Sequence, residues 1–182
     1  STGWKNIEDQ IWIIGSCNSE STLAASSYLE YFHGEVAGRP PLIDLYDEKF
    51  CQSFLRGAIL NDLVASSHDV SDGGLAVALS ECSIISSKGA IIDLDRKSNR
   101  LDNLLFSEGG SRIVFSVHSS KELTWLNYLK EAQKDLKDSI YIKKIGYVSG
   151  TNLIINVQKK EICNIKVEEL TEKFNNSIAG YF

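Results

Sequence analysis

The sequence lacks methionine, has only two prolines and contains no apolar run near the length of a membrane span. A helix that crosses a bilayer needs roughly 20 consecutive apolar residues, so we expect no membrane association. The start of the sequence shows no signal-peptide pattern, so none is expected. A chain that has no methionine and opens in this way is expected to be a processed or excised piece of a longer protein.

Positive charge is also scarce, since 19 Lys and Arg face 24 Asp and Glu for a net charge of -5. Nucleic-acid binding needs a basic face, so nucleic acid is not expected as a partner. The four cysteines, Cys17, Cys51, Cys82 and Cys163, include no CxxC pair, which argues against a zinc site. We expect reduced, mostly buried thiols in a cytoplasmic protein.

The length of 182 residues, with 43% hydrophobic and 24% charged residues, predicts one globular domain over residues 1–182. Hydrophobic periodicity predicts alternating strands and helices. Strands are expected at residues 10–16, 65–70, 88–94, 111–117, 140–148, 153–157 and 161–167. Helices are expected within residues 21–34, 44–64, 72–85, 101–106, 119–136 and 167–182.

Three features of this pattern are specific enough to be tested. Ser149-Gly150-Thr151-Asn152 predicts a hairpin between the two strands that flank it. Tyr28, Tyr31 and Phe32 are expected to form the core face of the first helix. Because the late strands follow one another, the fold class is α/β of the α+β type, with a mixed, largely antiparallel sheet covered by helices.

The first stretch that can carry chemistry is HDVSDGGLAVALSEC. Its polar and glycine residues are Asp69, Ser71, Asp72, Gly73 and Gly74. Ser71 or Asp72 can cap the following helix by accepting hydrogen bonds from its first amides. The glycines and the helix N-terminus also suit a phosphate, although the two aspartates would repel it unless Mg²⁺ lay between them. The spacing matches neither the dinucleotide fingerprint nor the P-loop, so a helix cap and a ligand loop both stand as hypotheses.

The second stretch, FSEGGSR, directly precedes a strand and combines Glu108, Gly109, Gly110, Ser111 and Arg112. Arg112 can hold a carboxylate or phosphate through two parallel hydrogen bonds. The alternative is a tight turn in which Arg112 pairs with Glu108, because Gly-Gly is a strong turn signal.

The order of the two motifs, HDVSDGGLAVALSEC and then LFSEGGSRIVFSV, is specific. The segments IWIIGS, FHGEVAGRPPLIDL, IGYVSGTNLIINV and KVEELTEKFNNSIAGYF extend the match over essentially the whole chain. On these residues the sequence resembles the phosphoribosylformylglycinamidine synthase (FGAM synthase) family. The resemblance implies the C-terminal subdomain of the second aminoimidazole-ribonucleotide-synthase-like half of the synthetase subunit.

The same resemblance implies that the whole enzyme uses ATP and Mg²⁺ to activate the formamide oxygen of formylglycinamide ribonucleotide. Ammonia from glutamine then displaces phosphate and gives the amidine. The family's catalytic histidine, principal Mg²⁺ ligands and main ATP contacts lie outside this chain, and its glutamine-hydrolysing cysteine is in another domain or subunit. The chain alone is therefore expected to be inactive, with no catalytic residue, metal ligand or tightly bound cofactor of its own.

The sequence departs from the family pattern at two turns. Glu108-Gly109-Gly110 replaces Glu-Ser-Gln of the family's first half, and Leu23-Ala24-Ala25-Ser26 replaces Leu-Gly-Gly-Ser. Two hypotheses follow: a cleft that meets nucleotide or substrate, or a structural half-domain with a degenerate site that scaffolds the catalytic half. The residues assigned to this cleft are Ser26, Asp69, Ser71, Asp72, Gly73, Gly74, Glu108, Gly109, Gly110, Ser111 and Arg112.

The resemblance also implies partners. These are the remaining subdomains of the same enzyme, a glutaminase subunit and a small accessory subunit. If Phe182 is the native end, no fused glutaminase follows, which matches the small form of the family. A face that is built to meet an absent subdomain would be partly apolar, so we expect the isolated chain to associate as a homodimer.

Overall fold

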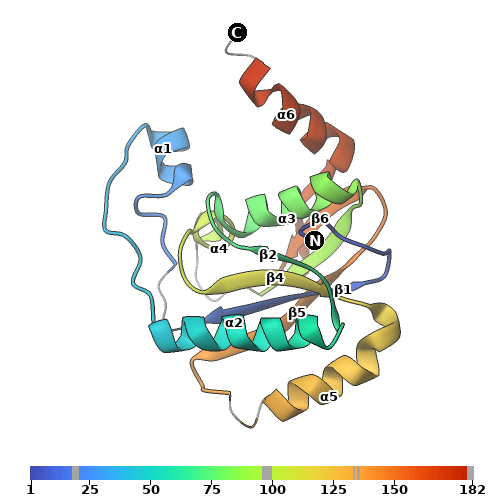
Figure 1. Ribbon diagram of the computed structural model, residues 1–182. Coiled ribbons are helices and arrows are strands. Elements are labelled where there is room, and N and C mark those ends of the chain that lie inside the picture. Colours follow the sequence, from blue (N-terminus) through green and yellow to red (C-terminus); the bar gives the residue numbers. More distant parts are fainter. Residues whose placement is uncertain (18–20, 96–99, 133, 135, 180–182) are drawn as a thin grey trace.

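Seven strands form one sheet in the order β2-β4-β1-β5-β3-β6-β7 (Figure 1). The computed structural model describes residues 1–17, 21–95, 100–132, 134 and 136–179. The strands are β1 (Gln10–Ser16), β2 (Val64–Asp69), β3 (Ala90–Leu94), β4 (Arg112–Val117), β5 (Ile140–Val148), β6 (Asn152–Val157) and β7 (Lys160–Lys166). β3 and β6 pair in parallel, and the other neighbouring strands pair antiparallel. The mixed, largely antiparallel sheet predicted from the sequence is confirmed.

Helices cover both faces of the sheet. The α-helices are α1 (Ser27–His33), α2 (Leu45–Leu60), α3 (Gly74–Ser86), α4 (Leu101–Phe106), α5 (Glu122–Ala132) and α6 (Val167–Ala179). Figure 1 shows α3 and α4 on one side of the sheet, α2 and α5 on the other, and α6 beyond α3. In β1, Ile11 and Ile13 belong to the core under α3, whereas Trp12 and Ile14 belong to the core under α2 and α5. Because strand side chains alternate between faces, β1 is buried along its whole length.

The predicted helix over residues 44–64 is shorter in the structure. The Asp44 side chain caps α2 by accepting hydrogen bonds from the backbone N–H groups of Tyr46 and Asp47, and the helix ends at Leu60 so that β2 can begin at Val64. The helix predicted over 119–136 starts with a 3₁₀ turn, η1 (Ser119–Lys121), before α5. Residues 133 and 135 of the helix predicted over 119–136, and residues 180–182 of the helix predicted over 167–182, lie outside the described residues. Among the helices that are described, none has the length and apolar composition needed to cross a bilayer.

The predicted hairpin between β5 and β6 is wrong, because β3 lies between these two strands. The link over residues 149–151 crosses the start of β3, where Gly89 N–H donates to Gly150 O at 2.9 Å and Ser149 N–H donates to Gly89 O at 3.0 Å. A side chain at residue 89 would lie 2.2 Å from Asn152 O, so glycine is required for this crossing. The hairpin that does form joins β6 to β7 through Gln158 and Lys159, both at positive φ (51° and 65°).

The prediction that Tyr28, Tyr31 and Phe32 form the core face of the first helix is also wrong. α1 has no buried residue, and Tyr31 and Phe32 are 83% and 62% exposed. Figure 1 shows α1 standing beside the sheet rather than on one of its faces. Tyr28 does pack, in a stacked arrangement on Phe106 with 5.1 Å between ring centroids. The predicted end of this helix at Gly34 is confirmed, with φ of 69°.

Candidate functional site

The two motifs singled out in the sequence meet at the carboxylate of Glu108. Its Oε1 accepts hydrogen bonds from the backbone N–H of Gly73 at 2.7 Å and of Ser27 at 2.8 Å. The backbone of Glu108 also pairs with Thr22 through two N–H···O bonds of 2.9 Å. We call residues 22–27, 69–74 and 106–112 the Glu108 turn cluster. Sequence reasoning missed Thr22, which no local pattern marks.

Glycine at residues 73 and 74 allows this close approach. Gly73 and Gly74 have φ of 74° and 71°, which only glycine adopts at little cost. A Cβ on Gly74 would lie 2.6 Å from Ser107 O and 2.7 Å from Phe106 C. The double glycine therefore lets the start of α3 pack directly against the turn that leads into β4.

The predicted cap of α3 by Ser71 or Asp72 is wrong. The N-cap residue is Gly73, with no side-chain cap from its own turn, and Ser71 and Asp72 are both exposed. The acceptor is Glu108, 35 residues further along the chain. A carboxylate at this position satisfies an open amide and also complements the positive end of the helix dipole.

The predicted pairing of Arg112 with Glu108 is also wrong. Arg112 Nη2 donates to Ser107 O at 2.6 Å, and its Nε donates to Gly109 O at 3.2 Å. These bonds hold the turn, in which Gly109 and Gly110 have φ of 82° and 74°. Burial lowers the pKa of the Arg112 guanidinium, and the nearby Tyr141 partly opposes this effect.

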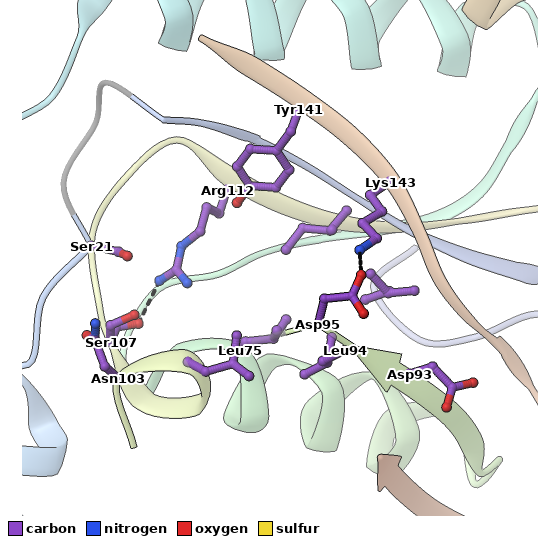
Figure 2. A pocket seen from close by; sticks show the side chains of 13 residues that line it. Ser21, Leu75, Asp93, Leu94, Asp95, Asn103, Ser107, Arg112, Tyr141 and Lys143 are labelled. Carbon is purple, nitrogen blue, oxygen red and sulfur yellow. Dashed lines mark hydrogen bonds and ion pairs between the residues drawn. The ribbon is translucent and has the colours of Figure 1, made fainter. Parts of the chain in front are cut away.

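Arg112 lines a pocket of about 360 Å³ between the sheet, α3 and α4. Figure 2 shows its guanidinium directed toward Ser107, with Tyr141 on the same side of the pocket and the ion pair of Lys143 and Asp95 further along. Sequence reasoning missed Tyr141, Lys143 and Asp95, because they come from β5 and the end of β3 and belong to no motif. The described lining is Ile13, Ser21, Leu75, Asp93, Leu94, Asp95, Asn103, Leu104, Ser107, Arg112, Tyr141, Lys143 and Ile145.

The other predicted site residues have structural contacts or lie on the surface. Ser26 Oγ caps α1 by accepting from Leu29 N–H at 3.2 Å. Ser111 is buried, and its carbonyl lies 4.0 Å from the Cys51 thiol. Asp69 is exposed, with Oδ1 at 3.9 Å from Nδ1 of His68. Within the described ranges, no group of three or more His, Cys, Asp or Glu side chains is arranged to hold a metal ion.

The mixed, largely antiparallel sheet and its two helical layers place the chain in the α+β class. The family model "AIR synthase related protein, C-terminal domain" matches residues 6–152, and the chain belongs to this family.

Relatives within the family carry a more particular name. The chain is 68% identical over all 182 residues to the phosphoribosylformylglycinamidine synthase subunit PurL of Prochlorococcus marinus strain MIT 9312, and 41% identical to that of strain MIT 9313 over 96% of the chain. It spans 23% of the length of each of these relatives.

Solved structures share the fold. "T. maritima PurL complexed with FGAR" superposes with a TM-score of 0.70 at 19% identity, covering 93% of this chain and 29% of that one. "T. maritima PurL complexed with ATP" superposes with a TM-score of 0.67 at 17% identity, over 93% and 26% of the two chains. At these identities the likeness establishes the fold of the chain and no ligand for it.

Proposed function

We propose that the polypeptide containing this chain is the synthetase subunit of FGAM synthase. It would convert formylglycinamide ribonucleotide, ATP and glutamine-derived ammonia to the amidine, ADP and phosphate. The observation that carries the proposal is the identity of 68% with a named PurL subunit over all 182 residues. Within that polypeptide we assign the chain to the C-terminal subdomain of the second half, as a single domain.

The Glu108 turn cluster does not fit ATP with Mg²⁺. The α3 N-terminus is where a phosphate would be expected, but the Gly73 N–H there already donates to the Glu108 carboxylate. A second anion at this place would meet Glu108 and the exposed carboxylates of Asp69 and Asp72. We therefore assign ATP and Mg²⁺ to the rest of the enzyme and derive no step of the reaction through this cluster.

Of the two hypotheses for the cluster, the structural one has more support. Glu108 joins the starts of α1 and α3 to the turn before β4. These bonds stabilise the fold, as a structural role requires. The Glu108 carboxylate occupies the position at which a ligand would have to bind. We infer that the chain supports the catalytic half of the enzyme and is inactive alone.

Assays on the complete polypeptide test both parts of this proposal. With its glutaminase and accessory partners, it should form the amidine in an ATP-dependent reaction, and a complete complex that makes none would overturn the assigned activity. Glu108→Ala should lower the melting temperature with little change in kcat, and Asp72→Ala should change neither. A large loss of kcat at an unchanged melting temperature would contradict the scaffold role and favour a substrate cleft.

We further propose a cytoplasmic location and the partners of the small form of the family, a glutaminase and a small accessory subunit. The four cysteines are unpaired, which suits a reducing compartment. A structure described as "PurLQS from Thermotoga maritima" shares the fold with a TM-score of 0.65. The isolated chain is proposed to form a homodimer through its exposed apolar side chains.

A further inference from the structure

Arg112 uses only one edge of its guanidinium inside the protein. Nε and Nη2 donate to the carbonyl oxygens of Gly109 and Ser107, and these two groups form one side of the planar fork. The edge made by Nη1 and the second Nη2 hydrogen has no hydrogen-bond partner in the part of the chain that the structure describes. No carboxylate among the described residues lies within ion-pair distance of this cation.

Tyr141 brings a second polar group to the same pocket. Its hydroxyl makes no hydrogen bond to any other described residue, although the side chain is partly buried and lines the cavity. Burial raises the pKa of the phenol, and the Arg112 cation partly opposes the rise. The two groups therefore interact electrostatically, and neither has an acidic partner among the described residues.

The other charged side chains among the described residues that line the pocket already have partners within the protein. Lys143 forms an ion pair with Asp95, and Asp93 accepts a hydrogen bond from Asn156 at 3.0 Å. The remaining surface is mostly aliphatic, from Ile13, Leu75, Leu94, Leu104 and Ile145. A cavity of about 360 Å³ with apolar walls and few polar groups is the usual form of a small-molecule site.

We propose that this pocket binds a small organic monocarboxylate. The carboxylate meets the unused edge of Arg112 and the Tyr141 hydroxyl, and the apolar body of the ligand covers Leu75 and Leu104. A carboxylate matches the two parallel N–H groups of the guanidinium and carries one charge for one cation. A phosphate dianion would bring a second charge toward Asp93 and Asp95, which disfavours it. The proposal stands independently of the reaction assigned above.

Isothermal titration calorimetry on the complete polypeptide tests the assignment with three probes. These are 4-methylpentanoate, its uncharged amide and inorganic phosphate. We expect the carboxylate to bind with a Kd on the order of 1 mM, as befits a ligand of this size. The amide should bind at least about tenfold more weakly, because it lacks the charge that Arg112 recognises. Phosphate should bind more weakly than the carboxylate.

Variants connect the binding to the pocket. Arg112→Met should weaken binding of 4-methylpentanoate by at least about tenfold, whereas Arg39→Met, the same change at an exposed arginine, should leave the Kd unchanged. Tyr141→Phe removes a hydroxyl with no bond to a described residue and should weaken binding about threefold. The Tyr141→Phe variant therefore tests whether the carboxylate binds in this pocket even if Arg112→Met does not fold. Absence of carboxylate binding, tighter binding of the amide, tighter binding of phosphate that Arg112→Met weakens, or a Kd unchanged in Tyr141→Phe would each overturn the proposal.

Discussion

The carboxylate of Glu108 lies 2.7 Å from the backbone nitrogen of Gly73, and its hydrogen bond closes the N-terminus of α3. The same oxygen accepts from Ser27 N–H at 2.8 Å. One side chain thus joins three turns that are distant in the sequence. An anion of the protein itself occupies the helix terminus at which an external anion would otherwise bind.

Removal of this carboxylate should destabilise the fold. Glu108→Ala leaves the Gly73 N–H without its acceptor and should lower the free energy of unfolding by about 1–2 kcal/mol. Glu108→Gln keeps an acceptor oxygen and should cost less than about 1 kcal/mol. Urea unfolding measures both. Asp72→Ala, an exposed carboxylate in the neighbouring turn, is the control and should stay within about 0.5 kcal/mol of the parent. An equal loss in Glu108→Ala and Asp72→Ala would show that the Glu108 bonds contribute nothing.

Replacement of Ala25 by glycine should stabilise the fold. The φ of Ala25 is 53°, which lies in the left-handed region, where a Cβ costs roughly 1–2 kcal/mol. Glycine removes this cost, and its greater flexibility in the unfolded chain cancels only part of the stabilisation. We expect Ala25→Gly to raise the free energy of unfolding by about 0.5–1 kcal/mol. Ala24→Gly, one residue earlier and outside the positive-φ region, should lower it by a similar amount. Equal effects of the two substitutions, measured by urea unfolding, would contradict this account of the turn.

Local signals explain what could be predicted about the fold. The apolar run of β1, the Asp44 cap of α2 and the Gly34 end of α1 are each encoded within a few residues. The strand order is not encoded locally. Ser149-Gly150 has a typical hairpin composition, but β3 pairs with both flanking strands because Gly89 lets the link cross it. Conversely, Gln158-Lys159 forms the actual turn without any turn residue.

The candidate site was predictable only in part, for the same reason. The two glycine motifs do lie together, but the hydrogen bonds between them join residues 35 apart, and nothing near Gly73 indicates that Glu108 is the acceptor. The pocket beside Arg112 takes Tyr141 and Lys143 from a strand far along the chain. These groups come together through strand pairing, which the pattern of hydrophobic residues does not specify.

The crossing at Gly89 gives a sharp test of the topology. In Gly89→Ala the new Cβ would meet the backbone of Asn152 at 2.2 Å and 2.5 Å, which neither segment can relieve without displacing a strand. We expect a loss of about 3 kcal/mol or more, or failure to fold. Gly150→Ala has a positive φ but open space around it and should cost about 1 kcal/mol. If urea unfolding gave the same loss for both variants, the close crossing of the two segments would be refuted.

Buried thiols should make stability depend on alkaline pH. Burial, with a smaller effect from Glu81, raises the pKa of Cys82 from 9.0 to about 12. The folded protein therefore keeps a proton that the unfolded chain loses above pH 9, so this contribution is full below pH 9 and falls as pH rises toward 12. For one such group, the free energy of unfolding falls by about 1.4 kcal/mol per pH unit over this range. Cys82→Ala should flatten the fall in unfolding free energy between pH 9 and pH 10.5 by this amount. Cys17→Ala, at an exposed thiol, should leave the slope unchanged, and identical slopes in all three proteins would exclude Cys82 as a cause.

The exposed apolar side chains around α1 and the start of α2 should drive self-association of the isolated chain. Tyr31, Phe32, Leu45 and Tyr46 are 62–83% exposed, and apolar surface of this kind is buried when a partner is present. Sedimentation of the 182-residue chain should show dimers whose fraction rises with concentration. Because burial of large apolar side chains contributes most of the association energy, Tyr31→Ser with Phe32→Ser should shift the chain to monomer. Leu60→Ser, which changes an equally exposed leucine at the other end of α2, should not. Dissociation by Leu60→Ser alone would move the contact to the far end of α2, and a monomer at every concentration would refute the dimer.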